Sequence, residues 1–242
     1  MKIDNEELEK LLCEATGCLG VALSDSQLAQ FVVYMEMLLE WRTKFNLTAI
    51  SNPREVVLKH FVDSLSVVGY IGGGANVIDV GTGAGFPGIP LGIALPDLRV
   101  TLLDAVSKRV GFLNAVIERL ELSHIRAIHA RAEDAARQLE HRENYDLAVS
   151  RAVAPMPILT EYALPFVSVG GRFIAMKGPS VQEELAGSGM AINTLGGAHT
   201  STISMEIPYT DITHSLVIIN KLSHTPPRFP RKASQISKKP II

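Results

Sequence analysis

The stretch 76–95 constrains the fold more than any other part of the chain. It begins as a short apolar run, breaks into glycines and becomes apolar again in a helical pattern: NVIDV, GTGAGFPG, IPLGIAL. Glycines let a backbone approach a ligand closely, and the helix that follows offers N–H groups with no partner inside the helix. A strand, a glycine loop and a helix in this order predict a cradle for a small molecule.

The spacing of the glycines distinguishes three kinds of cradle. A dinucleotide-binding loop has Gly or Ala at its sixth position, where this chain has the bulky Phe86. A P-loop ends in Lys and then Ser or Thr, and no such pair follows here. What remains is Asp-x-Gly-x-Gly-x-Gly (Asp79, Gly81, Gly83 and Gly85), which resembles motif I of class I S-adenosylmethionine-dependent methyltransferases. A turn that needs several glycines is the alternative.

After residue 75, strand and helix patterns alternate. Strands are predicted at 76–80, 99–103, 125–129, 145–149 and 171–176, and helices at 87–95, 107–121, 133–140, 156–166 and 180–194. This alternation predicts a parallel sheet covered on both faces and joined by right-handed crossovers. Two further strands, 199–207 and 215–222, are separated by a short turn. We therefore expect an α/β fold with a Rossmann-like, seven-stranded, mostly parallel sheet that ends in an antiparallel hairpin.

In such sheets the ligand lies at the carboxyl ends of the strands. Asp104 ends the second strand, 23 residues after Gly81, which is close to the spacing of the acid that binds a ribose hydroxyl. A helix cap is the alternative for Asp104. Ala132 and Glu133 follow the third strand and could contact adenine, although Glu133 alone is also typical of a first helical turn. The fourth and fifth strands are followed by Arg151 and Lys177.

Residues 1–70 are predicted to be helical and to precede the sheet as an extension. Asp4 could cap a first helix, Ser24 and Gln27 form a capping box for a second, and Asn52–Pro53 begins a third. Polar residues gather between and within these helices: Asn46, His60 and Asp63. Such a cluster is usually made of caps and surface residues, but its place just before the cradle keeps a binding role open.

We divide the chain into a helical extension (1–70), a core (71–225) and a basic tail (226–242). The net charge is −2, yet the tail has no acid and contains Arg228, Arg231, Lys232, Lys238 and Lys239. This pattern predicts a local contact with a polyanion, and a solvated tail is the alternative.

No apolar run has membrane-spanning length, no signal peptide is evident, and two cysteines are too few for a disulfide framework or a cysteine-only metal site. We expect a cytoplasmic protein that binds no metal.

Several motifs occur together in one known family. They are FNLT (45–48), HFVDS (60–64), DVGTGAGFPG (79–88), SRA (150–152), MKG (176–178) and RFPRKA (228–233). On these motifs the chain resembles the ribosomal RNA small subunit methyltransferase G family, also called glucose-inhibited division protein B. The resemblance implies S-adenosylmethionine-dependent methylation of guanine N7 in bacterial 16S ribosomal RNA, free or in a small-subunit precursor. It also implies cofactor contacts at Gly81, Phe86, Ala132, Glu133 and Arg151.

The residues agree with this chemistry. Methylation of a pyrimidine carbon usually needs a cysteine nucleophile, and neither Cys13 nor Cys18 follows a strand. Guanine N7 attacks with its own lone pair, so its methylation needs alignment rather than a general base. We therefore expect Arg151 and Lys177 to position the reactants, and the polar cluster (Asn46, His60, Asp63) and the tail to contact RNA. A monomer is expected. The alternatives are a cofactor-binding RNA-associated protein without turnover and a nicotinamide oxidoreductase.

Overall fold

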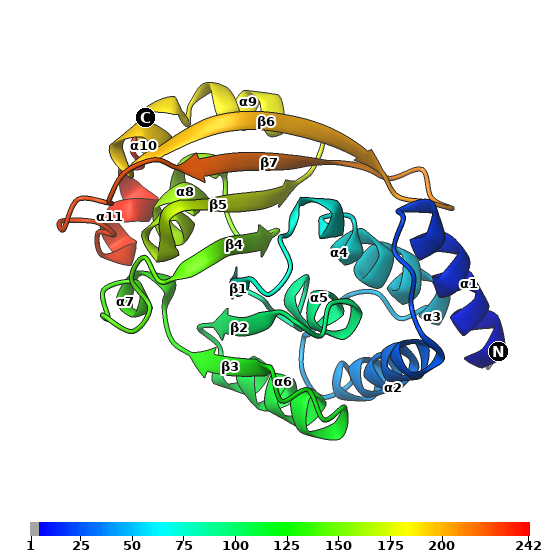
Figure 1. Cartoon of the computed structure of the whole chain (residues 1–242). Coiled ribbons are helices and arrows are strands. Elements are labelled where there is room, and N and C mark those ends of the chain that lie inside the picture. The colour runs from blue at the N-terminus through cyan, green and yellow to red at the C-terminus, as the bar shows by residue number, and fades with distance from the viewer. Residues whose placement is uncertain (1–4) are drawn as a thin grey trace.

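The computed structural model describes residues 5–242 and contains one seven-stranded sheet (Figure 1). The strands are β1 (Asn76–Val80), β2 (Arg99–Asp104), β3 (Ile125–His129), β4 (Tyr145–Arg151), β5 (Val167–Lys177), β6 (Gly197–Glu206) and β7 (Thr213–Lys221), in the spatial order β3-β2-β1-β4-β5-β7-β6. The strands β1 to β5 are parallel, and β7 pairs antiparallel with both β5 and β6. The predicted fold class is confirmed, with β6 at the edge of the sheet.

The core lies on both faces of this sheet because its strands are apolar on both sides, as strands buried in parallel sheets are. Alternate residues enter different clusters: Val77 and Val149 face one side, and Ile78 and Ala148 face the other. The first face is covered by α5 (Gly88–Ala94), α6 (Ser107–Arg119) and the N-terminal helices. The second is covered by α8 (Met156–Ala163) with the 3₁₀ turn η3 (Leu164–Phe166), α9 (Val181–Ala186) and α10 (Gly189–Thr194).

The N-terminal segment is helical as expected, with α1 (Asn5–Cys18), α2 (Asp25–Trp41), α3 (Pro53–Val56), a π-helical turn η1 (Val57–Val62), α4 (Asp63–Leu65) and a 3₁₀ turn η2 (Val68–Tyr70). The capping box of Ser24 and Gln27 is present, and Asn52 caps α3 by accepting from the N–H of Arg54 at 2.9 Å. The expected cap Asp4 lies outside the described residues. These helices share one hydrophobic cluster with α5, α6 and the sheet, so they are packed into the core.

Two helical predictions were too long. The expected helix 133–140 is the single turn α7 (Ala132–Ala135), and the expected helix 180–194 is split into α9 and α10 at Gly187 and Ser188. Glycine is a poor helix former, and the Ser188 hydroxyl donates back to the carbonyl of Glu184 at 2.5 Å, which ends α9 locally. The strand β5 begins at residue 167 rather than 171 and continues through Gly170 and Gly171.

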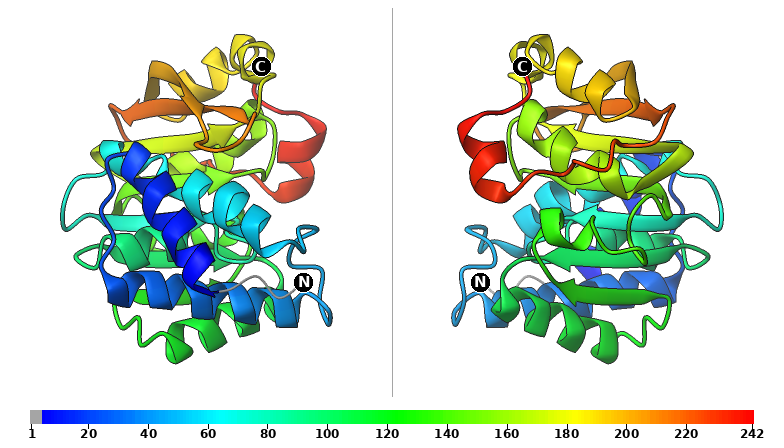
Figure 2. Two further views of the ribbon diagram at one scale, coloured as in Figure 1. Left: turned by 90° about the vertical axis from the view of Figure 1, so that its right-hand side faces the viewer. Right: turned by 90° about the vertical axis from the view of Figure 1, so that its left-hand side faces the viewer.

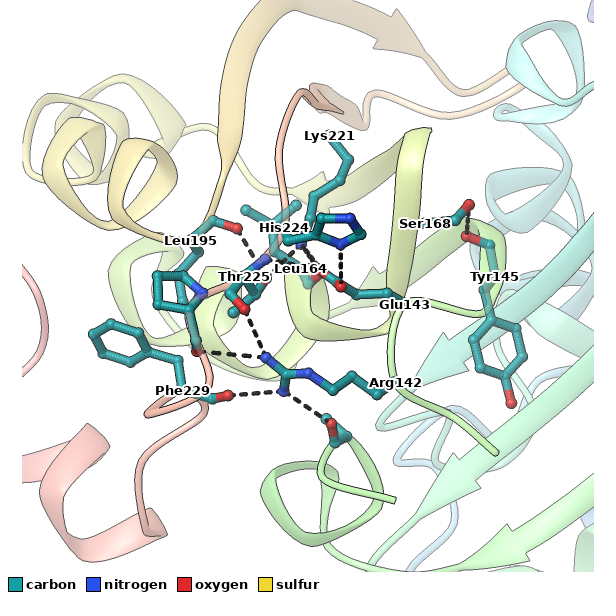
Figure 3. Close-up of polar contacts among 12 residues, drawn as sticks. Arg142, Glu143, Tyr145, Leu164, Ser168, Leu195, Lys221, His224, Thr225 and Phe229 are labelled. Carbon is teal, nitrogen blue, oxygen red and sulfur yellow. Dashed lines mark hydrogen bonds and ion pairs between the residues drawn. The ribbon is translucent and has the colours of Figure 1, made fainter. Parts of the chain in front are cut away.

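The basic tail is folded onto the protein. Phe229 and Ile236 are buried, and residues 233–238 form α11 (Ala233–Lys238). Arg142 donates to the carbonyl oxygens of Thr225 at 2.7 Å and Phe229 at 2.9 Å, which fixes the start of the tail (Figure 3). Beside it, Glu143 forms an ion pair with Lys221 and a hydrogen bond with His224 (Figure 3). The alternative of a disordered tail is therefore wrong, because the segment packs onto the core through Phe229 and Ile236.

Candidate cofactor and substrate site

The glycine loop after β1 has a backbone that only glycine adopts readily. Gly81, Gly83 and Gly85 have φ values of 72°, 63° and 105°. A Cβ atom at Gly81 would lie 2.6 Å from Cγ2 of Val153, and one at Gly85 would lie 2.6 Å from the Tyr34 hydroxyl. The loop is thus pressed against both the segment after β4 and the helix α2.

Asp79, at the end of β1, is fully buried beneath this loop. Its Oδ2 accepts hydrogen bonds from the Thr82 hydroxyl at 2.6 Å and from the Gly88 N–H at 2.8 Å. Its Oδ1 has no hydrogen-bond partner among residues 5–242. Burial raises the pKa of Asp79 to about 6, although both hydrogen bonds act in the opposite direction. The described residues thus leave one buried acceptor of this carboxylate without a donor.

A cavity of about 150 Å³ opens beside the loop, at the carboxyl ends of β1, β2 and β3. Its lining includes Gly81, Asp104, Ala132 and Glu133, which the sequence assigned to a cofactor, and also Tyr162 of α8, which it did not. Asp104 accepts from the N–H groups of Gly83 at 2.9 Å and Val106 at 2.8 Å. These bonds hold the Asp104 carboxylate at the cavity and connect the glycine loop to the start of α6.

Arg151 and Asp63 form the centre of a second cluster. The Arg151 guanidinium donates to Asp63 at 2.5 Å, to the Lys59 carbonyl at 3.2 Å and to Nδ1 of His60 at 3.2 Å. It also lies 5.0 Å from the centre of the Phe86 ring, on which His60 stacks at 4.5 Å. The buried Phe86 side chain is therefore packed against these neighbours, and its backbone N–H donates to the Thr82 carbonyl at 2.9 Å.

The same cluster controls the charge of its histidine. Burial lowers the pKa of His60 to about 4, and the Arg151 charge acts in the same direction. His60 is thus neutral at pH 7, with Nδ1 as the acceptor for Arg151 and Nε2 facing the Thr48 hydroxyl at 2.8 Å. Burial alone would raise the pKa of Asp63, but the hydrogen bond from His214 and the charge of Arg151 lower it below its ordinary value.

A second cavity, of about 180 Å³, lies at the carboxyl ends of β4 and β5 and includes Asp63, Arg151, Lys177 and His214 in its lining. No sequence pattern indicated His214, which comes from β7 and contacts the other oxygen of Asp63. Lys177 forms an ion pair with Glu184 at 2.6 Å and donates to the carbonyl of Ala154 at 3.0 Å. Both cavities are lined by residues of the segment 151–153.

Other predicted RNA contacts lie outside these cavities. Asn46 lines a separate groove beside the start of α6. In the tail, Arg228, Lys232, Lys238 and Lys239 are exposed, whereas Arg231 donates to Glu161 at 2.6 Å, where that carboxylate is fully buried. The Arg231 guanidinium is thereby bound within the protein, so its expected role as a free phosphate contact is corrected. A larger hollow of about 520 Å³ lies at the opposite, amino edge of the sheet, away from the glycine loop.

Comparison with known proteins identifies the family. The model of a family described as rRNA small subunit methyltransferase G matches residues 27–213. A protein of that name from Alkaliphilus oremlandii is 48% identical over 237 residues, which cover 97% of this chain and 99% of the relative. One from Acetivibrio thermocellus is 48% identical over 242 residues, covering 99% and 100%. The chain belongs to this family.

Membership confirms the resemblance seen in the sequence and makes the chain an S-adenosylmethionine-dependent methyltransferase. Solved structures agree on the fold. An O-methyltransferase from Bacillus cereus, in complex with SAH, superimposes with a TM-score of 0.53 at 21% identity, covering 78% of this chain and 91% of that one. A predicted O-methyltransferase from Agrobacterium tumefaciens gives a TM-score of 0.50 at 21% identity, covering 67% and 80%.

The residues fit the cofactor of a methyltransferase. Gly81 lines the same cavity as the carboxylates of Asp104 and Glu133, Gly83 has open space where a Cβ would stand, and one buried oxygen of Asp79 has no donor among residues 5–242. Hydroxyl and amine donors are what such acids bind, and a phosphate would be repelled by them. The site therefore suits a nucleoside with a positive charge better than it suits a dinucleotide.

Proposed function

We propose that this protein transfers the methyl group of S-adenosylmethionine to N7 of a guanine in small-subunit ribosomal RNA. Family membership supports the RNA substrate, since the relatives carry the name ribosomal RNA small subunit methyltransferase G. The observation that carries the chemistry is the pair of cavities at the carboxyl edge, both lined by the segment that follows β4. A donor in one cavity and an acceptor base in the other would meet across that segment.

The first cavity is assigned to the cofactor. We assign the ribose hydroxyls to Asp104, the adenine to Ala132 and Glu133, and the methionine part to the glycine loop with Asp79. When bound, the cofactor supplies an electrophilic methyl group on a positively charged sulfur. The protein's own contribution here is orientation, because Asp104 is fixed by two backbone N–H groups before any ligand arrives.

The second cavity is assigned to the guanine. Its N7 lone pair needs no deprotonation, and the described residues place no unpaired general base in this cavity: Asp63 is bound to Arg151 and His214, and Lys177 is bound to Glu184. Arg151 and Lys177 act as positioning residues, held in place by these partners. His60 and Asp63 serve the RNA contact mainly by holding Arg151.

The remaining assignments concern the RNA and the cell. We assign phosphate contacts to the exposed tail cations Arg228, Lys232, Lys238 and Lys239, and place Asn46 on the RNA side as well. The substrate is 16S ribosomal RNA or a precursor of the small subunit, met in the cytoplasm by a monomer. Among residues 5–242, no helix has the length and apolar character needed to cross a bilayer.

Transfer of a tritiated methyl group tests this function directly. Purified protein is incubated with labelled S-adenosylmethionine and small-subunit RNA, free and in assembled particles, and the RNA is digested to nucleosides. We expect label in 7-methylguanosine. Binding of both cofactor and RNA without label in any nucleoside would favour the alternative of an RNA-associated protein without turnover. Calorimetric heat with NAD but none with S-adenosylhomocysteine would favour the oxidoreductase.

A further inference from the structure

A basic groove lies next to the cofactor cavity. It has a volume of about 370 Å³ and runs between the loop after α2 and the first turn of α6. Its charged lining residues are all cations, namely Arg42, Lys44, Lys108 and Arg109. Because α6 follows directly after β2, the groove sits at the carboxyl edge of the sheet, where the cofactor cavity also opens.

Within the described part of the chain, two of these cations have no acidic partner. Among residues 5–242, neither Arg42 nor Lys108 lies within 4 Å of a carboxylate, and Nε of Arg42 is buried without a hydrogen-bond acceptor. Lys44 has an exposed partner in Glu40 at 3.0 Å, a kind of pair that contributes little. A buried donor without an acceptor destabilises the folded protein, and phosphate oxygens are strong acceptors.

An aromatic ring stands among the cations. Phe45 is half-buried, with Lys108 Nζ 5.4 Å from its ring centre and the Trp41 ring centre 5.9 Å away at a tilt of 45°. Contact with a second aromatic ring restricts the motion of the Phe45 ring. Cations beside an aromatic platform are the combination by which proteins hold single-stranded nucleic acid, with phosphates on the charges and a base on the ring. A simple inorganic anion would use the cations alone.

The groove is linked to the cofactor cavity through one residue. Arg109 lines the groove and lies 3.5 Å from Asp104, whose carboxylate also binds Gly83 of the glycine loop. Both views of Figure 2 show the loop between α2 and α3 on the same side of the molecule as α11 of the tail. The groove and the exposed tail cations therefore flank the same edge of the sheet.

We propose that this groove binds a single-stranded segment of the substrate RNA, with phosphates on Arg42, Lys44, Lys108 and Arg109 and an unstacked base on Phe45. The proposal rests on the function proposed above and adds a second RNA contact, distinct from the tail that composition indicated. Because Arg109 of the groove contacts Asp104 of the cofactor cavity, RNA bound in the groove would lie beside the methyl donor.

The salt dependence of RNA binding tests the proposal, with transcribed small-subunit RNA as the probe. Lys108→Gln removes one groove cation, and Arg119→Gln removes an equally exposed cation from the far end of the same helix. On single-stranded RNA, each lost phosphate contact should lower the slope of log affinity against log salt by about 0.7. We expect this change for Lys108→Gln and none for Arg119→Gln. Equal slopes for wild type and both variants would overturn the proposal.

A second variant separates stacking from charge. Phe45→Leu keeps an apolar side chain against Trp41 but removes the ring face, so RNA affinity should fall about fivefold or more while the salt slope stays at the wild-type value. Unchanged affinity would remove the stacking part of the proposal. S-adenosylhomocysteine binding serves as the folding control for each variant. If the wild type methylates RNA and the groove variants have the same RNA affinity and salt slope, only the groove assignment is wrong. If the wild type binds RNA but transfers no methyl group, the proposed function is wrong.

Discussion

Replacing Asp79 by asparagine should stabilise the protein at pH 8 and weaken cofactor binding. The carboxylate is fully buried, and only one of its oxygens is hydrogen bonded, to Thr82 at 2.6 Å and Gly88 at 2.8 Å. The asparagine Oδ1 can accept both of these bonds, so the change removes a buried charge and keeps its partners. The amide NH2 that replaces the other oxygen finds no acceptor there, which offsets part of the gain by about 1 kcal/mol or more. Residues arranged for ligand binding commonly reduce stability in this way.

The raised pKa of Asp79 gives the size and sign of the effect. Burial moves this pKa from 3.8 to about 6, so the folded protein binds the proton more tightly than the unfolded chain does. The stabilisation by the protonated form is complete below about pH 4 and is lost as the pH rises through 6. Keeping the group ionised at pH 8 therefore costs about 3 kcal/mol, of which about 1.4 kcal/mol is recovered at pH 5. The advantage of asparagine should shrink by that amount between pH 8 and pH 5.

Thermal unfolding of wild type and Asp79→Asn at both pH values measures this difference. A change of about 1.4 kcal/mol corresponds to roughly 3–6 °C in Tm for a chain of this size. Asp146→Asn is the matched control, because it removes an exposed carboxylate that accepts the Asn76 N–H at 2.8 Å. His60 acts in the opposite direction, because its pKa of about 4 means that folding stability is lost as the pH falls below 6.5. This loss is the same in all three proteins and cancels in the comparison. A Tm difference between Asp79→Asn and wild type that is the same at both pH values would refute the reasoning.

Three other perturbations test the site. Arg151→Lys keeps a cation beside Asp63 but loses the planar guanidinium, so turnover should fall on the order of a hundredfold with little change in Tm. Normal turnover per folded molecule would show that Arg151 is a structural residue only. Gly81→Val should abolish S-adenosylhomocysteine binding by calorimetry. In an unfolding titration it should cost about 1–2 kcal/mol for the left-handed backbone, plus the cost of displacing Val153, whose Cγ2 lies 2.6 Å from the added Cβ. Lys232→Gln with Lys238→Gln should lower the RNA salt slope by about 1.4, and an unchanged slope would remove the tail from the RNA contact.

The sheet could be predicted because its strands are short apolar runs between clear turns. Every predicted strand is present, and β1 was placed at its observed residues, 76–80. The carboxyl-edge rule then brought Gly81, Asp104 and Glu133 to one cavity from their order alone. Helix lengths were less predictable, since α7 ends after one turn at Ala135, whereas the sequence pattern predicted a helix to residue 140.

The partners of the predicted site residues could not be predicted. Asp63 meets Arg151 from 88 positions away and His214 from 151 positions away, and no local pattern encodes such a pairing. The availability of the tail cations could not be predicted for a similar reason. Its composition recorded five cations, but only the fold shows that Arg231 is neutralised by Glu161 and that Phe229 is buried. Composition describes charge, whereas the availability of a charge depends on what lies opposite it.

The N-terminal helices complete the site as well as covering the sheet. His60 lies within the π-helical turn η1, and Asp63 begins the α-helical turn that follows it. A π-turn inserts an extra residue into a helix and rotates the residues on either side of it, and such turns are frequent at functional sites. Here it accompanies a helix from which the Lys59 carbonyl, His60 and Asp63 all reach Arg151. Because the same helix buries Phe61 between Phe31 and Tyr34, the position of Arg151 depends on the packing of residues that precede the glycine loop.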